Sequence, residues 1–359
     1  MHSASSLRSD GRVRDHVLDL EVLQPGDIVL STTSEKISRS IRFFTNSPYS
    51  HAMLYVGNSL IHADGDGVFS LNPQRRIVAS DEIAVFRLRG GLDAGQQATV
   101  INHVRSEVGS LYSVPHAIVV GLMKFCGRDR SGKQFCSRLV AQSYRLAGQR
   151  LVRNADYCSP GALARSPLLE RIENALRPIT CLDAQIAATP DQLLEHQRQT
   201  FQWLRWVREI ARSRKKKITN ITSALDFIEA HPDIDVEAAG QLKLSGYLDH
   251  YRADESINTH RYSAQDFMQK YGPSREVLEK ELSLIQGLAE RVATSRQDAA
   301  NRPVTKTFNL LRDLHQNRAQ QLVVRLDVIL HVAAANGHPD LAYVALNVKA
   351  QLKLLTMNR

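Results

Sequence analysis

The stretch YSHAMLYVGNSLIHA, residues 49–63, has the pattern of a β-hairpin. Two apolar runs flank the dipeptide Gly57-Asn58, which is typical of a two-residue turn that joins antiparallel strands. Each predicted strand carries one histidine, His51 in the first and His62 in the second. The stretch therefore predicts part of a small antiparallel sheet, with two imidazoles on neighbouring strands.

The register of this hairpin decides whether the two histidines can meet. A two-residue turn places Val56 opposite Ser59 and, further along, His51 opposite Asp64. His62 then lies on the same face as His51, at a diagonal position roughly 7–8 Å away at the backbone. A shift of one residue would send His62 to the other face. The hairpin thus offers His51 as a base, His62 as its orienting partner and Asp64 as the alternative partner.

A second segment, QFCS at residues 134–137, marks the start of a predicted helix that ends before Gly148. Cys136 lies where the free backbone N–H groups and the helix dipole favour a thiolate and lower the thiol pKa. The same N–H groups can donate to an oxyanion. A thiol, a histidine base and a third group that orients the base form a nucleophile site. Cys136 and His51 are therefore candidates for a thiol nucleophile and its base, with an inert core cysteine and a structural histidine as the alternatives.

The other three cysteines, Cys126, Cys158 and Cys181, are expected to be inert, because none begins a clear helix. No two cysteines have CxxC spacing, so no zinc site is predicted, and neither a metal nor a cofactor is expected. Four cysteines in 359 residues do not make a disulfide framework, which fits a reducing compartment.

The chain carries a formal net charge of +9, which allows attraction to anionic surfaces. One dense basic run consists of Arg212, Arg214, Lys215, Lys216 and Lys217. It is a candidate for contact with an anionic membrane, and a solvated helix end is the alternative. A nucleic-acid partner is not expected, since the chain shows neither zinc-finger spacing nor an aromatic stacking platform.

The N-terminal residues MHSASS lack the apolar core of a signal peptide, and the longest apolar run, residues 117–123, is too short to span a bilayer. We therefore expect a cytoplasmic protein as synthesised. Delivery as an effector, by a route that reads no signal peptide, stays open.

The sequence pattern changes near residue 185, from mixed strand and helix patterns to helical patterns only. Residues 1–21 are polar and are expected to form a flexible arm. Residues 22–180 mix short strand and helix patterns, and residues 185–359 contain helical segments rich in Leu, Ala, Gln and Arg. The predicted fold class is α+β with a small antiparallel sheet, followed by an all-α accessory domain that gates the cleft or recruits a substrate or protein partner.

The expected elements follow from apolar periodicity and turn residues. Strands are predicted at 28–30, 51–56, 59–63, 68–71 and 83–88. Helices are predicted at 34–45, 94–109 and 135–146, with a short one after Pro160. In the helical half they are predicted at 190–212, 221–230, 235–250, 263–271, 274–295, 304–335 and 339–356.

Seven short motifs occur in a fixed order in the first half of the chain. They are PGDIVL (25–30), SIRFFT (40–45), YSH (49–51), LIHA (60–63), GSLY (109–112), FCSRLVA (135–141) and SPGALA (159–164). This ordered series resembles the circularly permuted NlpC-type papain-like hydrolases, the YiiX-like group and their lecithin:retinol acyltransferase-like relatives. In that family the histidine strand precedes the cysteine helix, as it does here. The resemblance covers about residues 22–175.

The resemblance implies Cys136 as nucleophile, His51 as general base and His62 at the third, polar position, which is His or Glu in relatives. One departure is the His51-to-His62 spacing, which is about one residue shorter than in these relatives. The third position is therefore less firmly assigned, and Asp64 remains the alternative. Tyr49 and Tyr112 are candidates for lining the cleft, with a packing role as the alternative for both.

Three functions are compatible with these features. The first is a cysteine hydrolase, a thiol protease or amidase, that cleaves an amide or ester bond in a peptide, isopeptide, peptidoglycan or lipid-linked substrate through a thioester. The second is a lipid acyltransferase or phospholipase of the same fold that acts at membranes. The third is a non-catalytic protein that binds a partner through its helical half.

Overall fold

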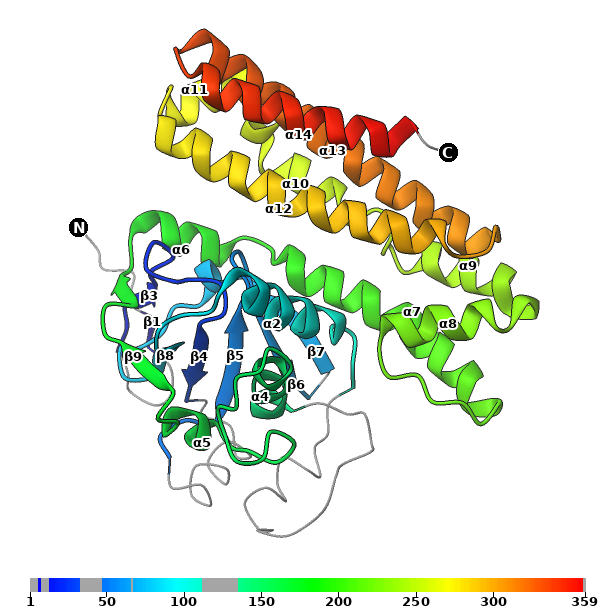
Figure 1. The fold of residues 1–359 in the computed structure, drawn as a ribbon, viewed down its shortest axis with the longest axis horizontal. Coiled ribbons are helices and arrows are strands. Elements are labelled where there is room, and N and C mark those ends of the chain that lie inside the picture. Colours follow the sequence, from blue (N-terminus) through cyan, green and yellow to red (C-terminus); the bar gives the residue numbers. More distant parts are fainter. Residues whose placement is uncertain (1–5, 8–12, 33–46, 66, 112–134, 358–359) are drawn as a thin grey trace. The chain divides into compact units, whose positions relative to one another are not determined.

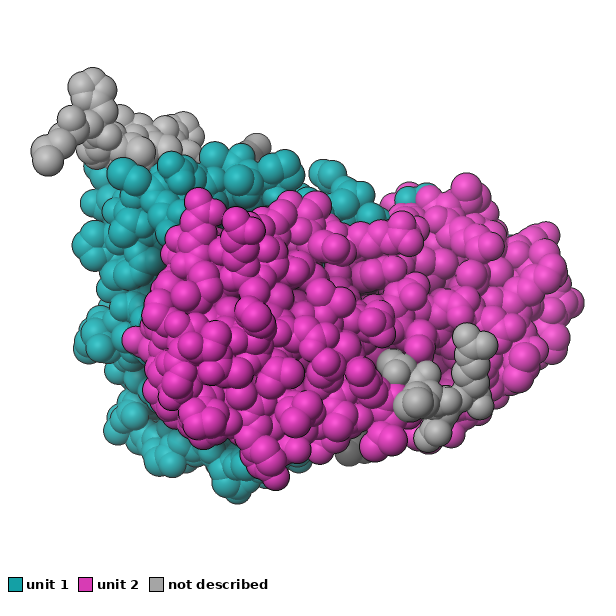
Figure 2. All heavy atoms as spheres, turned by 90° about the horizontal axis from the view of Figure 1, so that it is seen from above, with its two compact units in different colours: residues 1–204, 208–225 teal, residues 205–207, 226–359 magenta. Residues whose placement is uncertain are grey.

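The computed structural model describes residues 6–7, 13–32, 47–65, 67–111 and 135–357. They group into two compact units, residues 1–204 with 208–225 and residues 205–207 with 226–359, which Figure 2 colours separately. The helix predicted at 34–45, together with Tyr112 and Cys126, lies outside the described residues. No helix in the described ranges is both long and apolar enough to cross a bilayer.

The first unit is built on a six-stranded sheet in the order β7-β6-β5-β4-β8-β9 (Figure 1). All of its neighbouring strands are antiparallel. The strands are β4 (Ile28–Ser31), β5 (His51–Tyr55), β6 (Leu60–Asp64), β7 (Gly67–Leu71), β8 (Ile83–Leu88) and β9 (Leu169–Ile172). The sheet confirms the predicted α+β fold class.

The hairpin of β5 and β6 has the predicted register. Met53 lies opposite His62, and Leu54 lies opposite Ile61. The Val56 N–H donates to the Ser59 carbonyl at 2.9 Å and closes the turn. Gly57 occupies the turn with a φ of +98°, in the left-handed region that glycine adopts without a steric penalty.

Helices cover one face of this sheet. They are α2 (Ala94–Ser106), α4 (Cys136–Leu146) and α5 (Pro160–Ala164). α4 packs against α2, β5 and β6, and its Leu139 and Val140 share a core with Leu54 and Ile61. This is the face to which Ala52 and Leu54 of β5 belong, because side chains alternate along a strand.

The other face of the sheet has a second core, formed by residues such as Leu18, Met53 and Tyr55. Leu18 comes from β3 (His16–Leu18), which pairs with β10 (Leu176–Pro178), and the short β1 (Ser6–Leu7) pairs with β2 (Val13–Arg14). A 3-10 helix, η1 (Pro73–Arg75), follows β7. Residues 13–14 and 16–18, which the sequence predicts in a flexible arm, form strands instead, and the buried Leu18 joins this core.

Two further helices, α6 (Cys181–Ala188) and α7 (Gln192–Ser213), belong largely to the first unit, and α8 (Ile221–Glu229) begins in it. Arg208 of α7 donates to the Gly109 carbonyl at 2.5 Å. A Cβ built on Gly67, whose φ is +131°, would lie 2.7 Å from the Phe201 ring of α7. The compact units thus divide near residue 225, further along the chain than the predicted boundary at residues 180–185.

The second unit is helical, and most of its helices lie close to the predicted ranges. They are η2 (Pro232–Ile234), α9 (Asp235–Leu244), α10 (Arg252–Ile257), η3 (Thr259–Arg261), α11 (Ala264–Tyr271), α12 (Arg275–Ala300), α13 (Lys306–Ala335) and α14 (Pro339–Met357). Helices α12, α13 and α14 pack on one another around residues such as Leu278, Ile285 and Leu326.

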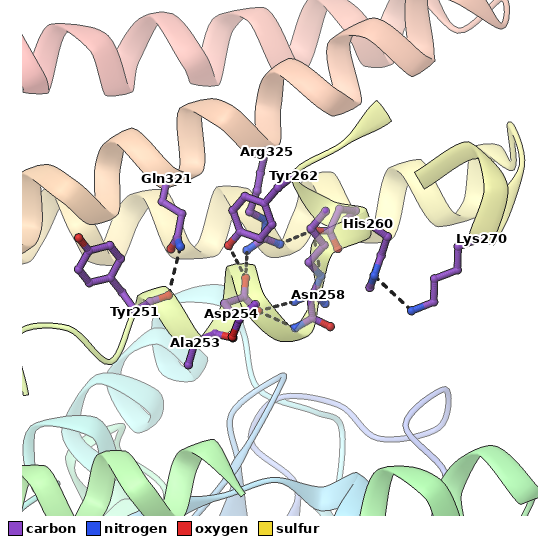
Figure 3. Close-up of polar contacts among 12 residues, drawn as sticks. Tyr251, Ala253, Asp254, Asn258, His260, Tyr262, Lys270, Gln321 and Arg325 are labelled. Atoms are coloured by element: carbon purple, nitrogen blue, oxygen red, sulfur yellow. Dashed lines mark hydrogen bonds and ion pairs between the residues drawn. The ribbon is translucent and has the colours of Figure 1, made fainter. Parts of the chain in front are cut away.

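A polar cluster ties the short helices of this unit to the long ones (Figure 3). Asp254 of α10 accepts hydrogen bonds from Asn258 at 2.7 Å and from the Tyr262 hydroxyl at 2.6 Å. It also faces Arg325 of α13 at 3.5 Å, and Arg325 donates to Glu281 of α12. Because Asp254, Arg325 and Glu281 each have an opposite charge beside them, these ion pairs are explained by packing alone.

Asp27 anchors the start of β4. Only 1% of Asp27 is exposed, and both of its carboxylate oxygens accept from Arg87 of β8 at 2.7 Å. It also accepts from the Gln24 N–H at 2.8 Å, and the Tyr144 hydroxyl of α4 donates to the Gly26 carbonyl at 2.5 Å. The turn before β4 is thereby fixed to β8 and to α4.

We expect Asp27→Ala to lower the free energy of unfolding of the first unit by about 3 kcal/mol, because it leaves the Arg87 guanidinium largely buried without its counter-charge. Hydrogen exchange of β4 and β8 peptides in urea measures this. Glu173→Ala is the matched control, since it removes a surface pair with Arg171 at 3.5 Å and should cost less than about 1 kcal/mol. Equal effects of the two substitutions would contradict the anchoring role.

Candidate active site

The two hairpin histidines are joined by a hydrogen bond. His51, the first residue of β5, has its Nε2 atom 2.7 Å from Nδ1 of His62 on β6. The ring centroids are 4.9 Å apart, and the ring planes are nearly perpendicular at 86°. The structure thus brings together the two imidazoles that the hairpin register predicts on one face.

Both imidazoles are neutral at neutral pH. Burial lowers the pKa of His51 to about 4; the Asp64 carboxylate acts to raise it and Arg76 to lower it further. Burial also holds the pKa of His62 well below its usual value, and the charges of His51 and Arg76 add to this effect. His62 is 4% exposed and packs its ring against Phe69, with centroids 4.2 Å apart.

The hydrogen bond between the rings restricts their tautomers. If His51 donates from Nε2, its Nδ1 atom is the ring nitrogen that can accept a proton. His62 then accepts at Nδ1 and carries its own proton on Nε2. That Nε2 atom is buried and has no hydrogen-bond partner in the part of the chain that the structure describes. His62 therefore orients His51 without contributing a full negative charge.

Asp64, the alternative third member, is exposed at the end of β6. Its carboxylate accepts from the Gly65 N–H at 2.7 Å. It influences His51 and Cys136 through its charge, whereas His62 contacts His51 directly. The geometry therefore favours His62 over Asp64 as the partner of His51.

Cys136 is the first residue of α4, as predicted, and Phe135 precedes it as the N-cap residue in an extended conformation. Burial raises the pKa of the Cys136 thiol to about 11, although hydrogen bonds from the backbone at Ala52 and Ser137 act to lower it. The predicted lowering of this pKa is therefore wrong for the described structure. The helix start supplies the expected donors, but removal of the thiol from water outweighs them.

The Cys136 thiol lies at the backbone of Ala52, the residue that follows His51. No hydrogen bond joins the thiol to the His51 ring within the described residues. Strand alternation explains this, since His51 emerges on the face of Met53, while α4 covers the face of Ala52. The structure thus places Cys136 and His51 at the same end of β5, on either side of the strand.

The charge state of the two groups follows from their pKa values. Moving a proton from a thiol of pKa about 11 to an imidazole of pKa about 4 costs on the order of 9 kcal/mol before the new charges attract. With pKa values of about 11 and about 4, the resting Cys136 thiol and the resting His51 imidazole are both neutral near pH 7.

A second cysteine, for which the sequence predicts no role, holds the start of α4. The Ser137 hydroxyl donates to the Cys158 carbonyl at 2.7 Å, and the Cys158 thiol donates to the Ser137 carbonyl at 3.3 Å. These reciprocal hydrogen bonds connect the residue after Cys136 to the segment before α5. A buried pair of this kind has no local sequence pattern, although FCSRLVA and SPGALA lie on either side of it.

Arg76, which follows η1, is the second residue near the site that sequence reasoning missed. Its guanidinium lowers the pKa of both His51 and His62. The Nε atom of Arg76 is buried and has no hydrogen-bond partner among the described residues. No pattern in the sequence around it points toward the hairpin.

The other candidate residues are placed away from this chemistry. Tyr49 packs edge-on against Phe86 with ring centroids 6.1 Å apart, which fits the packing alternative. In the described ranges, no group of three or more His, Cys, Asp or Glu side chains is arranged to hold a metal ion. The basic run lies at and beyond the C-terminal end of α7, and Lys215, Lys216 and Lys217 are exposed. Cations are stabilised at that end of a helix dipole without any ligand.

Comparisons with known proteins bear on the first half of the chain. Residues 22–167 match the family model described as permuted papain-like amidase enzyme, YaeF/YiiX, C92 family. The crystal structure of metalloprotein yiiX from Escherichia coli O157:H7 aligns at 18% identity over 42% of this chain and 96% of that chain. The TM-score of this alignment is 0.29. No curated protein matches the chain.

The family match covers the strands that carry His51 and His62 and the helix that Cys136 begins. The antiparallel sheet with α4 packed on one face is consistent with it. Residues 22–167 are therefore a permuted papain-like domain, similar to the YaeF/YiiX amidase family.

Proposed function

We propose that this protein is a cysteine-dependent hydrolase that cleaves an amide or ester bond through a thioester intermediate. The observation that carries the proposal is the placement of the Cys136 thiol at the backbone of Ala52, the residue that follows His51, while the His51 ring is hydrogen-bonded to His62. The amidase family match over residues 22–167 supports the same reaction class.

In the first half-reaction, the sulfur of Cys136 attacks the substrate carbonyl carbon while the thiol proton moves to Nδ1 of His51. His62 accepts a hydrogen bond from Nε2 of His51 and keeps that ring in the required tautomer. The carbonyl oxygen becomes an oxyanion, for which the backbone N–H groups at the start of α4 are the available donors. The tetrahedral intermediate then collapses to a thioester, and His51 returns its proton to the departing amine or alcohol.

In the second half-reaction, His51 removes a proton from water, and the resulting hydroxide attacks the thioester carbonyl. The acyl group leaves as an acid, and the proton on His51 restores the Cys136 thiol. Because the resting thiol is neutral, proton removal accompanies attack in this scheme. His51 must therefore reach the sulfur in the substrate complex, where catalytic hydrogen bonds shorten relative to the free enzyme.

Substitution of the two central residues tests the reaction. We expect Cys136→Ala to reduce hydrolysis of p-nitrophenyl acetate to the background rate and to abolish the acyl-enzyme adduct in intact-mass spectra. His51→Ala should lower the rate by about 10²–10⁴-fold, the usual contribution of a positioned base. Cys181→Ala, which changes an exposed cysteine on α6, is the matched control and should leave the rate unchanged. Adduct formation by Cys136 that is insensitive to His51→Ala would overturn the pairing.

The pH dependence of alkylation tests the neutral resting state. Only the thiolate reacts, so iodoacetamide labelling of a thiol with a pKa of about 11 should rise about tenfold per pH unit between pH 7 and 10. His51 stays neutral throughout, because its pKa is about 4. Peptide mass spectrometry separates Cys136 from the other cysteines, and the Cys136→Ala protein gives the background. A rate that is flat between about pH 5 and 9 would instead indicate a preformed thiolate–imidazolium pair.

A further inference from the structure

A cavity of about 100 Å³ lies beside the C-terminal end of α4, in the first unit. Arg145 of α4 lines it together with Arg150, Arg153 and Asn154 from the segment that follows the helix. A cavity needs only about 10–15 Å³ to accept one water molecule, so this one has room for several waters or for a small polyatomic ion.

The three arginines are not equally neutralised. Arg145 faces the Asp156 carboxylate at 3.4 Å, and Asp156 also accepts from Gln142 at 2.6 Å. Burial acts to raise the pKa of Asp156, but the Gln142 bond and the Arg145 charge outweigh it, so the pKa is lowered and the carboxylate is ionised. Asp156 therefore offsets the charge of Arg145.

Arg150 and Arg153 have no side-chain hydrogen bond or ion pair with any residue in the described ranges. Their two positive charges remain on the wall of the cavity. The apolar part of the same wall is held in place, since Leu151 is 3% exposed and Ala155 is 6% exposed. Isolated arginines on a surface need no ligand, but here three arginines, two of them unpaired among the described residues, line one cavity.

We propose that this cavity binds a phosphate group. A guanidinium group presents its N–H donors in a planar fork that matches the oxygens of phosphate. The two uncompensated charges balance a phosphate dianion, and four phosphate oxygens can serve three guanidinium groups, whereas a carboxylate has only two oxygens. The phosphate comes either from a free phosphate compound or from a lipid headgroup.

This site is separate from the candidate active site. Arg145 lies nine positions after Cys136 in the same helix, which corresponds to about 14 Å along the axis. Phosphate binding at this cavity is independent of the hydrolase activity, and binding measurements alone test it. The segment that carries Arg150 and Arg153 continues to Cys158, which is hydrogen-bonded to Ser137, the residue after Cys136.

Calorimetric titration of the full-length protein with inorganic phosphate at low ionic strength tests the site. We expect Arg150→Gln and Arg153→Gln each to weaken phosphate binding roughly tenfold, and the double variant to bind no measurable phosphate. Both side chains are exposed, so circular dichroism and Tm should stay as in the wild type. Arg171→Gln is the matched control, because it removes one positive charge from an exposed side chain of β9 in the same unit.

Unchanged binding by the double variant, or equal weakening by Arg171→Gln, would overturn the proposal, since either result means that phosphate responds only to overall charge. Sedimentation with phosphatidylcholine vesicles, with and without phosphatidic acid, then identifies the source of the phosphate. Loss of vesicle binding in the double variant assigns a lipid headgroup. Loss of phosphate binding with no vesicle binding by the wild type assigns a free phosphate compound.

Discussion

Strand β5 has a hydrogen-bonded neighbour on each edge and a hydrophobic core on each face, so none of its residues can shift alone. Its pairing with β6 sets His51 against His62, and its backbone at Ala52 meets the Cys136 thiol. Movement by one residue would exchange the two faces and separate all three groups. The local chemistry of the site is thus a consequence of sheet register, which is itself set by the tight turn at Gly57.

Desolvation determines the charges at this site. It lowers the pKa values of His51 and His62 and raises that of the Cys136 thiol, so all three groups are neutral near pH 7. A neutral third member suits this arrangement, because a buried carboxylate at the position of His62 would need its own counter-charge. The charges that act on the uncharged thiol and imidazoles come from Arg76 and Asp64.

The parts that could be predicted from sequence are those fixed by local pattern. Turn chemistry at Gly57 gave the correct hairpin register, and the apolar rhythm placed the start of α4 at Cys136. The sign of the Cys136 pKa change could not be predicted, because burial depends on how α4 packs against β5. The strands β3 and β10 are only three residues long, too short for a periodic signal. The charge effect of Arg76 on the histidines and the hydrogen bonds of Cys158 join segments that are distant in sequence, so no spacing rule reveals them.

Gly67 shows that the papain-like domain packs against α7, which lies beyond the residues that match the family. A side chain there would collide with the Ser110 carbonyl at 2.4 Å as well as with Phe201. The strand β7 is therefore shaped to receive an aromatic ring from a helix that begins 25 residues after the end of the family match. Trp203 and Leu204 of that helix are also almost fully buried. A fragment that ends at residue 167 would lack α7 and would expose to water the apolar surface that Phe201, Trp203 and Leu204 cover. Such a fragment would be less soluble than the full first unit.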